Sequence, residues 1–476
     1  MQILVINTNS HTVPVPVMPL GACLVADAAA SAGQTVRFLD LMFAKNPRKA
    51  LTQELAAFPP DAIGLSVRNI DGNDMQSPLS FIADLPPLLD TIRLLSRAPV
   101  ILGGAAVAVM PEEMISYTGA PYAVLGDAAR VFPLLLEAVA DNRIPEEIPG
   151  AAWLENGKVR INPCAPSPDM RTHCPVPAYR RWINVNKYLS LQTTAPLQTK
   201  LGCRFNCVYC TYSRIEGGNY SLCTPESVRD AVQNLVSQGF RDIEIVDNVF
   251  NAPYDHAMEV CEELAGSPSP ARLQSMELNP LFVDDALLQA MAKARFNSIG
   301  ITVESASDKA LKGLGKNYSA REVYHAAEVV ARHDLPCLWI FMLGGPGETE
   351  ETVKETLRFA ETRIRKNDVA YFNLGIRIYP GTELEMIARK QGLLSLSRRE
   401  MLEPVFYVSP EISYSWLILH MRKTISAHMN FVCSDTLGMP SLPAIQRLGY
   451  TLGIRPPLWR YTRLIRSGLR LLGLAA

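Results

Sequence analysis

Three cysteines lie within one run of eight residues in the segment LGCRFNCVYC: Cys203, Cys207 and Cys210. Three thiolates on one short loop can bind three irons of a cubane 4Fe-4S cluster, and this leaves the fourth iron without a protein ligand. An iron with an open site can bind and reduce a small molecule, whereas a fully ligated cluster only transfers electrons. The spacing therefore predicts catalytic metal ligands rather than a simple electron carrier.

The other seven cysteines stand singly: Cys23, Cys164, Cys174, Cys223, Cys261, Cys337 and Cys433. A thiol cluster in a long chain that begins with an apolar strand, and not with a signal peptide, is typical of a metal site in a reducing cytosol. We therefore expect a cytoplasmic protein. A zinc site with Cys223 as the fourth ligand stays open as an alternative, although the paired C-x-x-C knuckles of many such sites are missing.

Composition sets broad limits on the class of protein. The 476 residues are 48% hydrophobic and carry 46 basic against 47 acidic side chains. A near-neutral chain of this length is typical of a globular protein with two or three domains, and it gives no general case for nucleic acid binding. We find no run of about 20 apolar residues, so we expect no transmembrane segment.

Residues 1–140 alternate short apolar strands with helical stretches. This order predicts a doubly wound, Rossmann-like parallel sheet, in which ligands bind where strands end in loops at the C-terminal edge. The candidate loops span residues 7–20, 68–76, 103–112 and 126–130. Residues 141–190 are rich in Pro and Arg and show little periodicity, so we expect a linker.

Residues 191–390 resume the alternation, with strands expected at 196–201, 242–247, 272–277, 298–303, 337–343 and 370–378. Six β/α units predict a partial (β/α)6 barrel, similar to a TIM barrel, with its chemistry at the strand C-termini. The cysteine loop follows the first of these strands.

Residues 391–476 predict a small, mostly helical region. Its last forty-one residues contain six Arg and no Asp, Glu or Lys. We expect a terminal helix that caps the barrel with its arginines in solvent. A basic amphipathic helix of this kind can instead contact an anionic membrane surface, which stays open as a peripheral interaction.

The C-x-x-x-C-x-x-C run and the aromatic residues beside it resemble the radical S-adenosylmethionine (SAM) superfamily. The resemblance implies that Cys203, Cys207 and Cys210 bind the cluster, whose open iron is chelated by the amino and carboxylate groups of SAM. It also implies that Tyr209 packs on the adenine of SAM.

Further segments follow in the order that this family shows. IEIVDN resembles the second strand, which implies that Asp247 and Asn248 lie near the SAM amino group. GITVESASDKALKGLGK resembles the fourth strand, where Glu304 and Ser305 would reach the ribose and carboxylate of SAM.

FMLGGPGET resembles the fifth-strand turn against the adenine. Gly344 and Gly345 would let the backbone approach the flat ring there, because they carry no Cβ. RIYPGTELEMIARKQG resembles the sixth-strand ending of the cobalamin-dependent branch.

Residues 18–41, 101–115 and 122–139 resemble the cobalamin-binding domain found before many such barrels. The resemblance implies cobalamin contacts from Arg68, Asn69, Gly103, Gly104 and Gly126. A flavodoxin-like domain without a ligand is the alternative.

The chain lacks the Asp-x-His-x-x-Gly loop that supplies a histidine below cobalt in other cobalamin proteins. We expect His11 to be a surface residue. We place Arg68 near the lower face, where a guanidinium that keeps its proton cannot ligate cobalt and disfavours a strongly bound lower ligand. A simple pairing of Arg68 with Asp71 or with a cobalamin amide stays open as the alternative.

The two resemblances together imply a methyltransferase. A 5′-deoxyadenosyl radical would take hydrogen from an unactivated carbon, and methylcobalamin would donate its methyl group to that carbon. A rearrangement or cyclisation without methyl transfer, a polar methylation, and a sensor that regulates a partner stay open. The substrate is a small molecule, peptide or lipid of unknown identity, and we expect a flavodoxin or ferredoxin as electron donor.

Overall fold

The computed structural model describes residues 1–434 and 442–471 of the chain. Within these ranges the first sheet has the order β2-β1-β3-β4-β5-β6-β7. Its strands are β1 Gln2–Asn7, β2 Thr35–Asp40, β3 Ala62–Ser66, β4 Val100–Gly103, β5 Tyr122–Val124, β6 Ala151–Glu155 and β7 Lys158–Ile161. The first five are parallel, and the β6–β7 hairpin adds antiparallel strands at one edge. The predicted doubly wound sheet is therefore present.

Helices cover both faces of this sheet. On one face α1, Leu20–Ser31, packs against α6, Ala128–Ala140, and on the other α2, Pro47–Ala57, packs against α3, Leu85–Leu95. The buried positions of α1 are Ala22, Cys23, Ala26 and Ala29. Their spacing of one, three and three residues places them on one helix face, and their small side chains let the helix approach closely.

The second sheet has the order β19-β16-β15-β14-β13-β12-β9, and all its pairings are parallel. Its strands are β9 Ala195–Leu197, β12 Asp242–Ile245, β13 Arg272–Leu278, β14 Phe296–Glu304, β15 Cys337–Leu343, β16 Val369–Leu374 and β19 Phe431–Cys433. Each of the six predicted strands has a counterpart among them. The seventh, β19, comes from the C-terminal region, where we expected helices.

The helices of the barrel, except α11, follow a Ser, Thr or Asp, residue types that can cap a helix. They are α10 Pro225–Ser237, α11 Tyr254–Gly266, α12 Asp285–Lys293, α13 Asp308–Gly313, α14 Ala320–Ala331, α15 Glu350–Arg363 and α16 Glu383–Lys390. Thr224, Asp284 and Thr382 each accept a backbone N–H of the first turn, of α10, α12 and α16 respectively. Such caps satisfy donors that a helix cannot satisfy internally.

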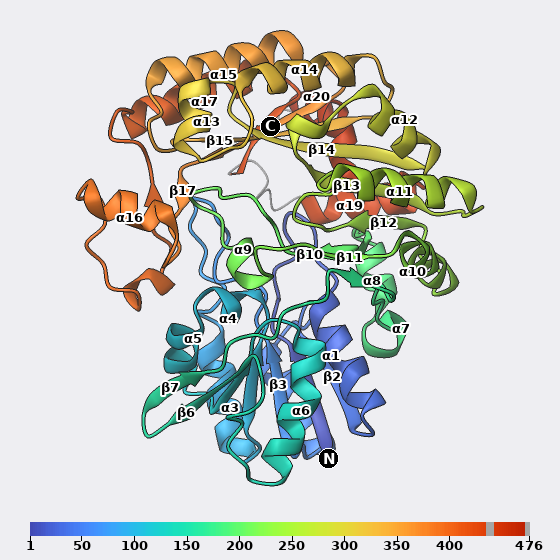
Figure 1. The fold of residues 1–476 in the computed structure, drawn as a ribbon, viewed down its shortest axis with the longest axis vertical. Coiled ribbons are helices and arrows are strands. Elements are labelled where there is room, and N and C mark those ends of the chain that lie inside the picture. Colours follow the sequence, from blue (N-terminus) through green and yellow to red (C-terminus); the bar gives the residue numbers. More distant parts are fainter. Residues whose placement is uncertain (435–441, 472–476) are drawn as a thin grey trace.

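The two sheets stand one above the other, with the short helix α9, Tyr212–Ile215, between them (Figure 1). Residues 141–190, expected to be an irregular linker, contain the β6–β7 hairpin and the short helices α7, Tyr179–Trp182, and α8, Val185–Leu189. Their side chains bond to the first sheet and its helices: Trp182 donates to Asp27 and Tyr188 to Asp40. This segment therefore fixes the first domain to the second.

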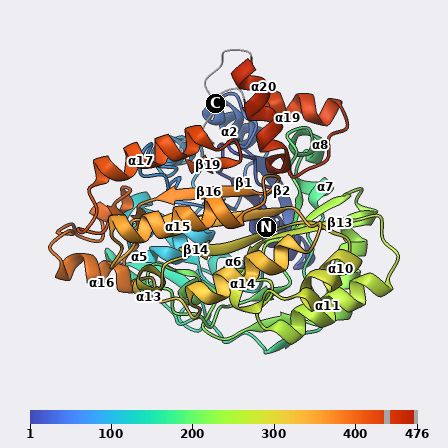
Figure 2. The ribbon, with the colours of Figure 1, turned by 90° about the horizontal axis from the view of Figure 1, so that it is seen from above.

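The C-terminal region contains α17 Tyr414–Ala427, α19 Leu442–Thr451 and α20 Thr462–Leu471, which lie along one side of the barrel in Figure 2. The expected row of solvated arginines is wrong at Arg466, which is buried and donates to the carbonyls of Ile425 and His428 near the end of α17. The helix end supplies acceptors that sequence periodicity does not reveal. None of the helices in the described ranges is both long and apolar enough to cross a membrane.

Candidate functional site

The first half of the site is a small cavity at the C-terminal edge of the first sheet. Strand order reverses there, because β1 is followed in the chain by β2 on one side and pairs with β3 on the other. Such a point leaves a crevice in which ligands bind. The cavity is lined by Thr8, Asn9 and His11 after β1, by Val67, Arg68 and Asn69 after β3, and by Phe81.

His11 is a lining residue of this cavity and not the surface residue we expected. Its ring stacks on Phe81 with 4.0 Å between centroids. Burial lowers the pKa of His11, with the charge of Asp84 opposing the shift, so the neutral imidazole is favoured. The sequence carried no signal for this, because the partner ring is seventy residues away in the chain.

Arg68 faces the second domain. Its side chain keeps contact with solvent, and its guanidinium interacts with Tyr212 and with Glu244 on β12. Enclosure between the domains lowers the pKa of Arg68, while these two groups raise it. An arginine remains charged under such conditions. The loop after β3 therefore presents a cation to the inner side of the barrel.

The glycines predicted to contact cobalamin allow close approaches between segments of the first domain. Gly104 has φ +102°, and a Cβ there would lie 2.3 Å from the carbonyl oxygen of Val67. Added Cβ atoms at Gly103 and Gly126 would lie 3.1 Å from Val124 and 3.0 Å from Cys164. The close approach at Gly104 lets the loop after β4 pack directly on the loop after β3.

The second half of the site is the cysteine loop, which follows β10, Lys200–Leu201, and precedes α9. Cys203 is buried, Cys207 and Cys210 are half-buried, and all three are free thiols. Backbone hydrogen bonds close the loop, from Cys203 to Gly217 and from Cys210 to the carbonyl of Cys207, both at 3.1 Å. The three thiols are thus held on one loop at the strand ends.

The donor set fits an iron–sulfur cluster better than a zinc ion. Burial raises the pKa of Cys210 to about 12, and the neighbouring thiols add to this, so the thiolates need a cationic partner. No group of three or more Cys, His, Asp or Glu within 1–434 and 442–471 is close enough to hold one metal ion. A cubane differs, because each thiolate binds a different iron. Cys223 pairs with the Cys174 thiol and not with this loop.

Tyr209, Glu304 and Lys316 form a buried network beside the loop. The Tyr209 hydroxyl donates to Glu304 Oε1 at 2.7 Å, and Lys316 Nζ donates to the same oxygen at 3.1 Å. Burial would lower the pKa of Lys316, but Glu304 and Tyr209 raise it well above its usual value. Glu304 Oε2 is buried without a hydrogen-bond partner. We did not single out Lys316, although it closes the segment that suggested Glu304.

The other predicted SAM residues bond within the protein. Asp247 accepts from the backbone N–H of Thr199 at 2.7 Å, and Asn248 Nδ2 donates to Glu216 at 2.6 Å. The Ser305 hydroxyl pairs with Thr356 at 2.8 Å. These contacts leave the roles of the three side chains toward SAM as predictions.

The predicted glycine turn is held by a carboxylate that we did not predict. The amides of Gly344 and Gly345 both donate to Glu348 Oε2, at 2.5 and 3.0 Å. Burial raises the pKa of Glu348 to about 7, while the two amides oppose the shift. A carboxyl therefore fixes the path of the turn after β15.

Two further carboxylates line the inner side of the barrel. Glu244 lies on β12, and Glu277 lies on β13. Burial raises the pKa of Glu277 to about 8, and the nearby charge of Glu304 adds to the shift. Both side chains stay partly accessible, so the inner side facing Arg68 is polar and acidic. A single acidic residue in a strand carries no sequence signal that could have marked them.

Fold and site together define a two-domain α/β enzyme: a ligand-binding sheet of nucleotide-binding type stands before a partial barrel with a cluster loop. The model of the Radical SAM superfamily matches residues 198–360, and that of the B12 binding domain matches residues 6–136. The two matches together support a cobalamin-dependent radical SAM enzyme, as the sequence predicted.

Several relatives are methyltransferases by name. An uncharacterized methyltransferase of Pyrococcus horikoshii, PH0819, is 27% identical over 62% of this chain, which spans 64% of that protein. Tryptophan 2-C-methyltransferase of Streptomyces laurentii is 23% identical over 78% of this chain and 72% of its own length.

Solved structures share the fold over the whole chain. TsrM from Kitasatospora setae, a radical SAM methyltransferase with cobalamin and a [4Fe-4S] cluster bound, has a TM-score of 0.86 at 21% identity and covers 99% of this chain and 98% of its own. OxsB, a cobalamin-dependent SAM radical enzyme, has a TM-score of 0.69 at 15% identity, covering 99% and 75%. At these identities the likeness establishes the fold alone.

Proposed function

We propose that the chain transfers a methyl group from cobalamin to a carbon atom of its substrate. The observation that carries this proposal is the packing of α4, Ala105–Val109, which follows the loop after β4, against α9, which follows the cysteine loop. Arg68, in the neighbouring loop after β3, lies within electrostatic reach of Tyr212 on α9. The two proposed cofactor sites would thus open toward one another. The methyltransferase names of PH0819 and the tryptophan enzyme support the same reaction.

When bound, the cluster supplies the electron that cleaves SAM, and cobalamin carries the methyl group. Cys203, Cys207 and Cys210 would hold the cluster. Proposed SAM contacts come from Tyr209, Asp247, Asn248, Glu304, Ser305, Gly344 and Gly345, and proposed cobalamin contacts from Arg68, Asn69, Gly103, Gly104 and Gly126.

Glu304 has the clearest role of its own. Its Oε1 is occupied by Tyr209 and Lys316, while its buried Oε2 has no partner. A buried acceptor without a donor is costly, and a ribose hydroxyl of SAM would satisfy it. Lys316 holds the carboxylate in one orientation through its bond to Oε1.

Arg68 would hold a positive charge beside bound cobalamin and, because it keeps its proton, would not ligate cobalt itself and would disfavour a strongly bound ligand on that side. Replacing Arg68 with Leu should therefore slow both the reduction of bound cobalamin and its methylation by SAM. Unchanged rates of both steps would rule this role out. His11, neutral and stacked on Phe81 in the same cavity, would form the opposite wall.

The test is anaerobic purification with cluster reconstitution and added hydroxocobalamin. We expect absorption spectra of both cofactors and, with a reductant and methyl-deuterated SAM, transfer of the deuterated methyl group to cobalamin without any substrate. If the protein binds cobalamin but the cobalamin never receives this methyl group, the proposal is contradicted and a rearrangement or cyclisation is favoured. If the protein binds both cofactors but neither cleaves SAM nor methylates cobalamin, it is a sensor.

Radical and polar methyl transfer differ in their products. With a substrate, a radical reaction forms equal amounts of 5′-deoxyadenosine and S-adenosylhomocysteine, whereas polar methylation forms no 5′-deoxyadenosine. We propose a radical reaction, a cytoplasmic location, and a flavodoxin or ferredoxin as the one-electron donor. The inner carboxylates Glu244 and Glu277 face the space where the substrate, a small molecule, peptide or lipid, would bind.

A further inference from the structure

The loop that carries Arg68 continues into a short hairpin. Residues 67–81, which we call the β3 hairpin, follow β3 directly. Gly72 donates to the carbonyl of Leu79 at 3.0 Å, and Phe81 donates to that of Ile70 at 2.8 Å. Phe81 in turn stacks on His11. The hairpin is thus continuous with the lining of the cavity, to which both Arg68 and Phe81 belong.

The hairpin tip is bound to the barrel through a buried ion pair. Arg377 Nε donates to Asp71 Oδ2 at 2.7 Å, and the two side chains are only 3% and 0% exposed. Asp71 Oδ1 accepts from the backbone N–H of Asn73 at 2.9 Å. The two partners lie 306 residues apart and belong to different domains. Within residues 1–434 and 442–471, no other ion pair joins the hairpin to the barrel.

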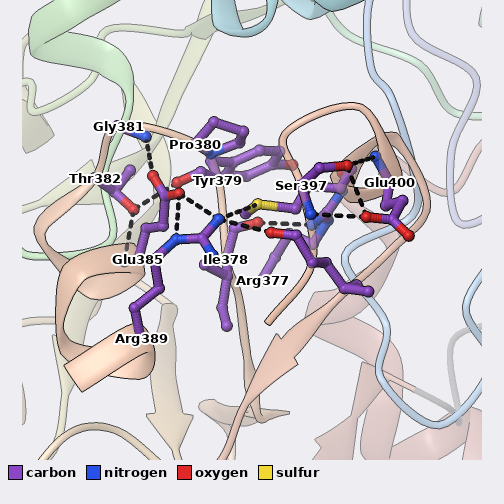
Figure 3. Close-up of polar contacts among 12 residues, drawn as sticks. Arg377, Ile378, Tyr379, Pro380, Gly381, Thr382, Glu385, Arg389, Ser397 and Glu400 are labelled. Carbon is purple, nitrogen blue, oxygen red and sulfur yellow. Dashed lines mark hydrogen bonds and ion pairs between the residues drawn. The ribbon is translucent and has the colours of Figure 1, made fainter. Parts of the chain in front are cut away.

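All three guanidinium nitrogens of Arg377 donate hydrogen bonds. It lies on β17, Ile376–Arg377, and also donates to the carbonyls of Ile378 at 2.6 Å and Met401 at 2.7 Å. Figure 3 shows how the chain then runs through Tyr379 into the turn before α16. A planar guanidinium that donates from all three of its nitrogens holds its partner in one orientation.

Two further contacts beside the ion pair join the β3 hairpin to the barrel. The Tyr379 hydroxyl donates to Asn73 Oδ1 at 3.0 Å. Gly375 lies against Met75, because a Cβ there would meet Met75 Sδ at 2.3 Å. Alternate residues of the hairpin tip, Asp71, Asn73 and Met75, therefore all contact the chain segment that leaves β16, Val369–Leu374.

A buried ion pair contributes little net stability compared with apolar packing, because both charges lose their hydration. Removing one partner is nevertheless costly, since the other charge remains buried. The Asp71–Arg377 ion pair is therefore explained better by the geometry that it imposes than by the stability that it contributes. Apolar contacts would allow the hairpin to slide, whereas the pair fixes both distance and direction.

We propose that Asp71 and Arg377 are positioning residues that hold the β3 hairpin, and with it Arg68 and the cobalamin site, in register with the open end of the barrel. The role of the hairpin toward cobalamin rests on the proposed function, whereas the contact between hairpin and barrel does not. The contact places no atom of either residue on a reacting group, so both act through the hairpin.

The experiment compares Asp71→Asn, Arg377→Met and the double variant with wild type. Arg365→Met is the matched control, because Arg365 likewise joins a buried aspartate, Asp368, to backbone carbonyls, those of His333 and Leu335, but inside the barrel. Three quantities are measured: amide hydrogen exchange in residues 68–80, the Kd for hydroxocobalamin, and the electron paramagnetic resonance spectrum of the cob(II)alamin-loaded protein.

We expect exchange in residues 68–80 to be at least about tenfold faster and the Kd to rise about tenfold in both single variants, because the hairpin opens locally more often. The cobalt spectrum should change in the same direction as in Arg68→Leu. The double variant should lose no more than the worse single variant, since the two residues act as one unit. Arg365→Met should lower thermal stability and leave all three quantities unchanged.

Wild-type exchange, Kd and spectrum in Asp71→Asn and Arg377→Met would overturn the inference, as would equal effects of Arg365→Met. A wild-type chain that binds no cobalamin would instead overturn the proposed function. Hydrogen exchange of the apoprotein then still decides whether the ion pair holds the hairpin.

Discussion

Glu304 combines an unusual backbone conformation with a carboxylate that bonds to two other side chains. Its backbone has φ +58°, an unusual conformation for a residue with a side chain, and its carboxylate is shared between Tyr209 and Lys316. Such strain persists only where the surroundings over-determine it. The sequence suggested Glu304 and Tyr209 through family resemblance, but their hydrogen bond to one another and to Lys316 depends on tertiary structure. Residue types were therefore easier to predict than their pairings.

The cysteine loop gives the first prediction. Replacing Cys207 with Ala should reduce the iron and sulfide of the reconstituted protein to below about a tenth of the wild-type content, because a cubane held by two thiolates is not retained. Cleavage of SAM should be lost with it. Cys261→Ala, in the buried face of α11, is the control and should keep both. Full iron content in Cys207→Ala would exclude the proposed ligand set.

Glu348 gives a prediction about pH. Burial raises its pKa to about 7, against an ordinary value of 4.5. The folded protein therefore binds this proton more tightly than the unfolded chain, and its contribution to stability is lost as pH rises from about 4.5 to about 7. A shift of this size corresponds to about 3 kcal/mol at most.

Glu348→Gln keeps an acceptor for the amides of Gly344 and Gly345 and does not ionise. In urea unfolding at about pH 5 and about pH 8, wild type should lose more free energy of unfolding than this variant, by about 2 kcal/mol. Glu355→Gln, at an exposed position of α15, should follow wild type. An identical pH dependence in wild type and Glu348→Gln would refute the assignment.

At the scale of elements, strands and loops differ in how far sequence determines them. Every strand of the second sheet that we predicted is present, because buried parallel strands read as short apolar runs between helices. Strand β19 was missed because three residues, Phe431–Cys433, are too few to show a period. The β6–β7 hairpin was missed because it lies in a segment whose Pro and Arg content indicated a linker. Edge elements depend on partners far away in sequence.

Gly104 carries the prediction for the loops. Gly104→Ala should raise the Kd for cobalamin by about tenfold or more, because the new Cβ would collide with the Val67 carbonyl and push the loops after β3 and β4 apart. Gly157→Ala is matched in backbone strain, with φ +74°, but has open space around the added Cβ. It should cost about 1 kcal/mol of stability and leave cobalamin binding unchanged. Equal Kd values for the two variants would contradict this account of the loop.

At the scale of the whole molecule, the domain order was predictable and the docking between domains was not. Resemblance of the N-terminal segments and the cysteine run indicated a cobalamin domain before a radical SAM barrel, and the family matches confirm it. The sequence offered Asp71 only as a possible partner of Arg68, whereas it pairs with Arg377, an ordinary charged residue of a distant segment. The pair becomes visible only when both domains are folded and joined.

The C-terminal region shows the same limit and gives the last prediction. Periodicity placed the arginines of 462–471 on one solvated side, yet Arg466 is only 5% exposed. It donates to the carbonyls of Ile425, His428 and Phe431, near the C-terminal end of α17. Arg466→Met would remove a charged donor from each of these carbonyls, although those of Ile425 and His428 keep a backbone N–H, so we expect a loss of about 2 kcal/mol in urea unfolding.

Arg463→Met is the control, because Arg463 is exposed on the same helix, and it should change stability by less than about 0.5 kcal/mol. Limited proteolysis adds a local readout: the segment after residue 455 should be cleaved faster in Arg466→Met only. If the two variants unfold at the same urea concentration and resist protease equally, α20 is not anchored through Arg466. Its arginines would then all be available to an anionic surface, and binding of wild type to phosphatidylserine vesicles would be expected. If α20 is anchored through Arg466, wild type should bind these vesicles weakly. Arg466→Met, which releases the helix, should then bind them more strongly than wild type.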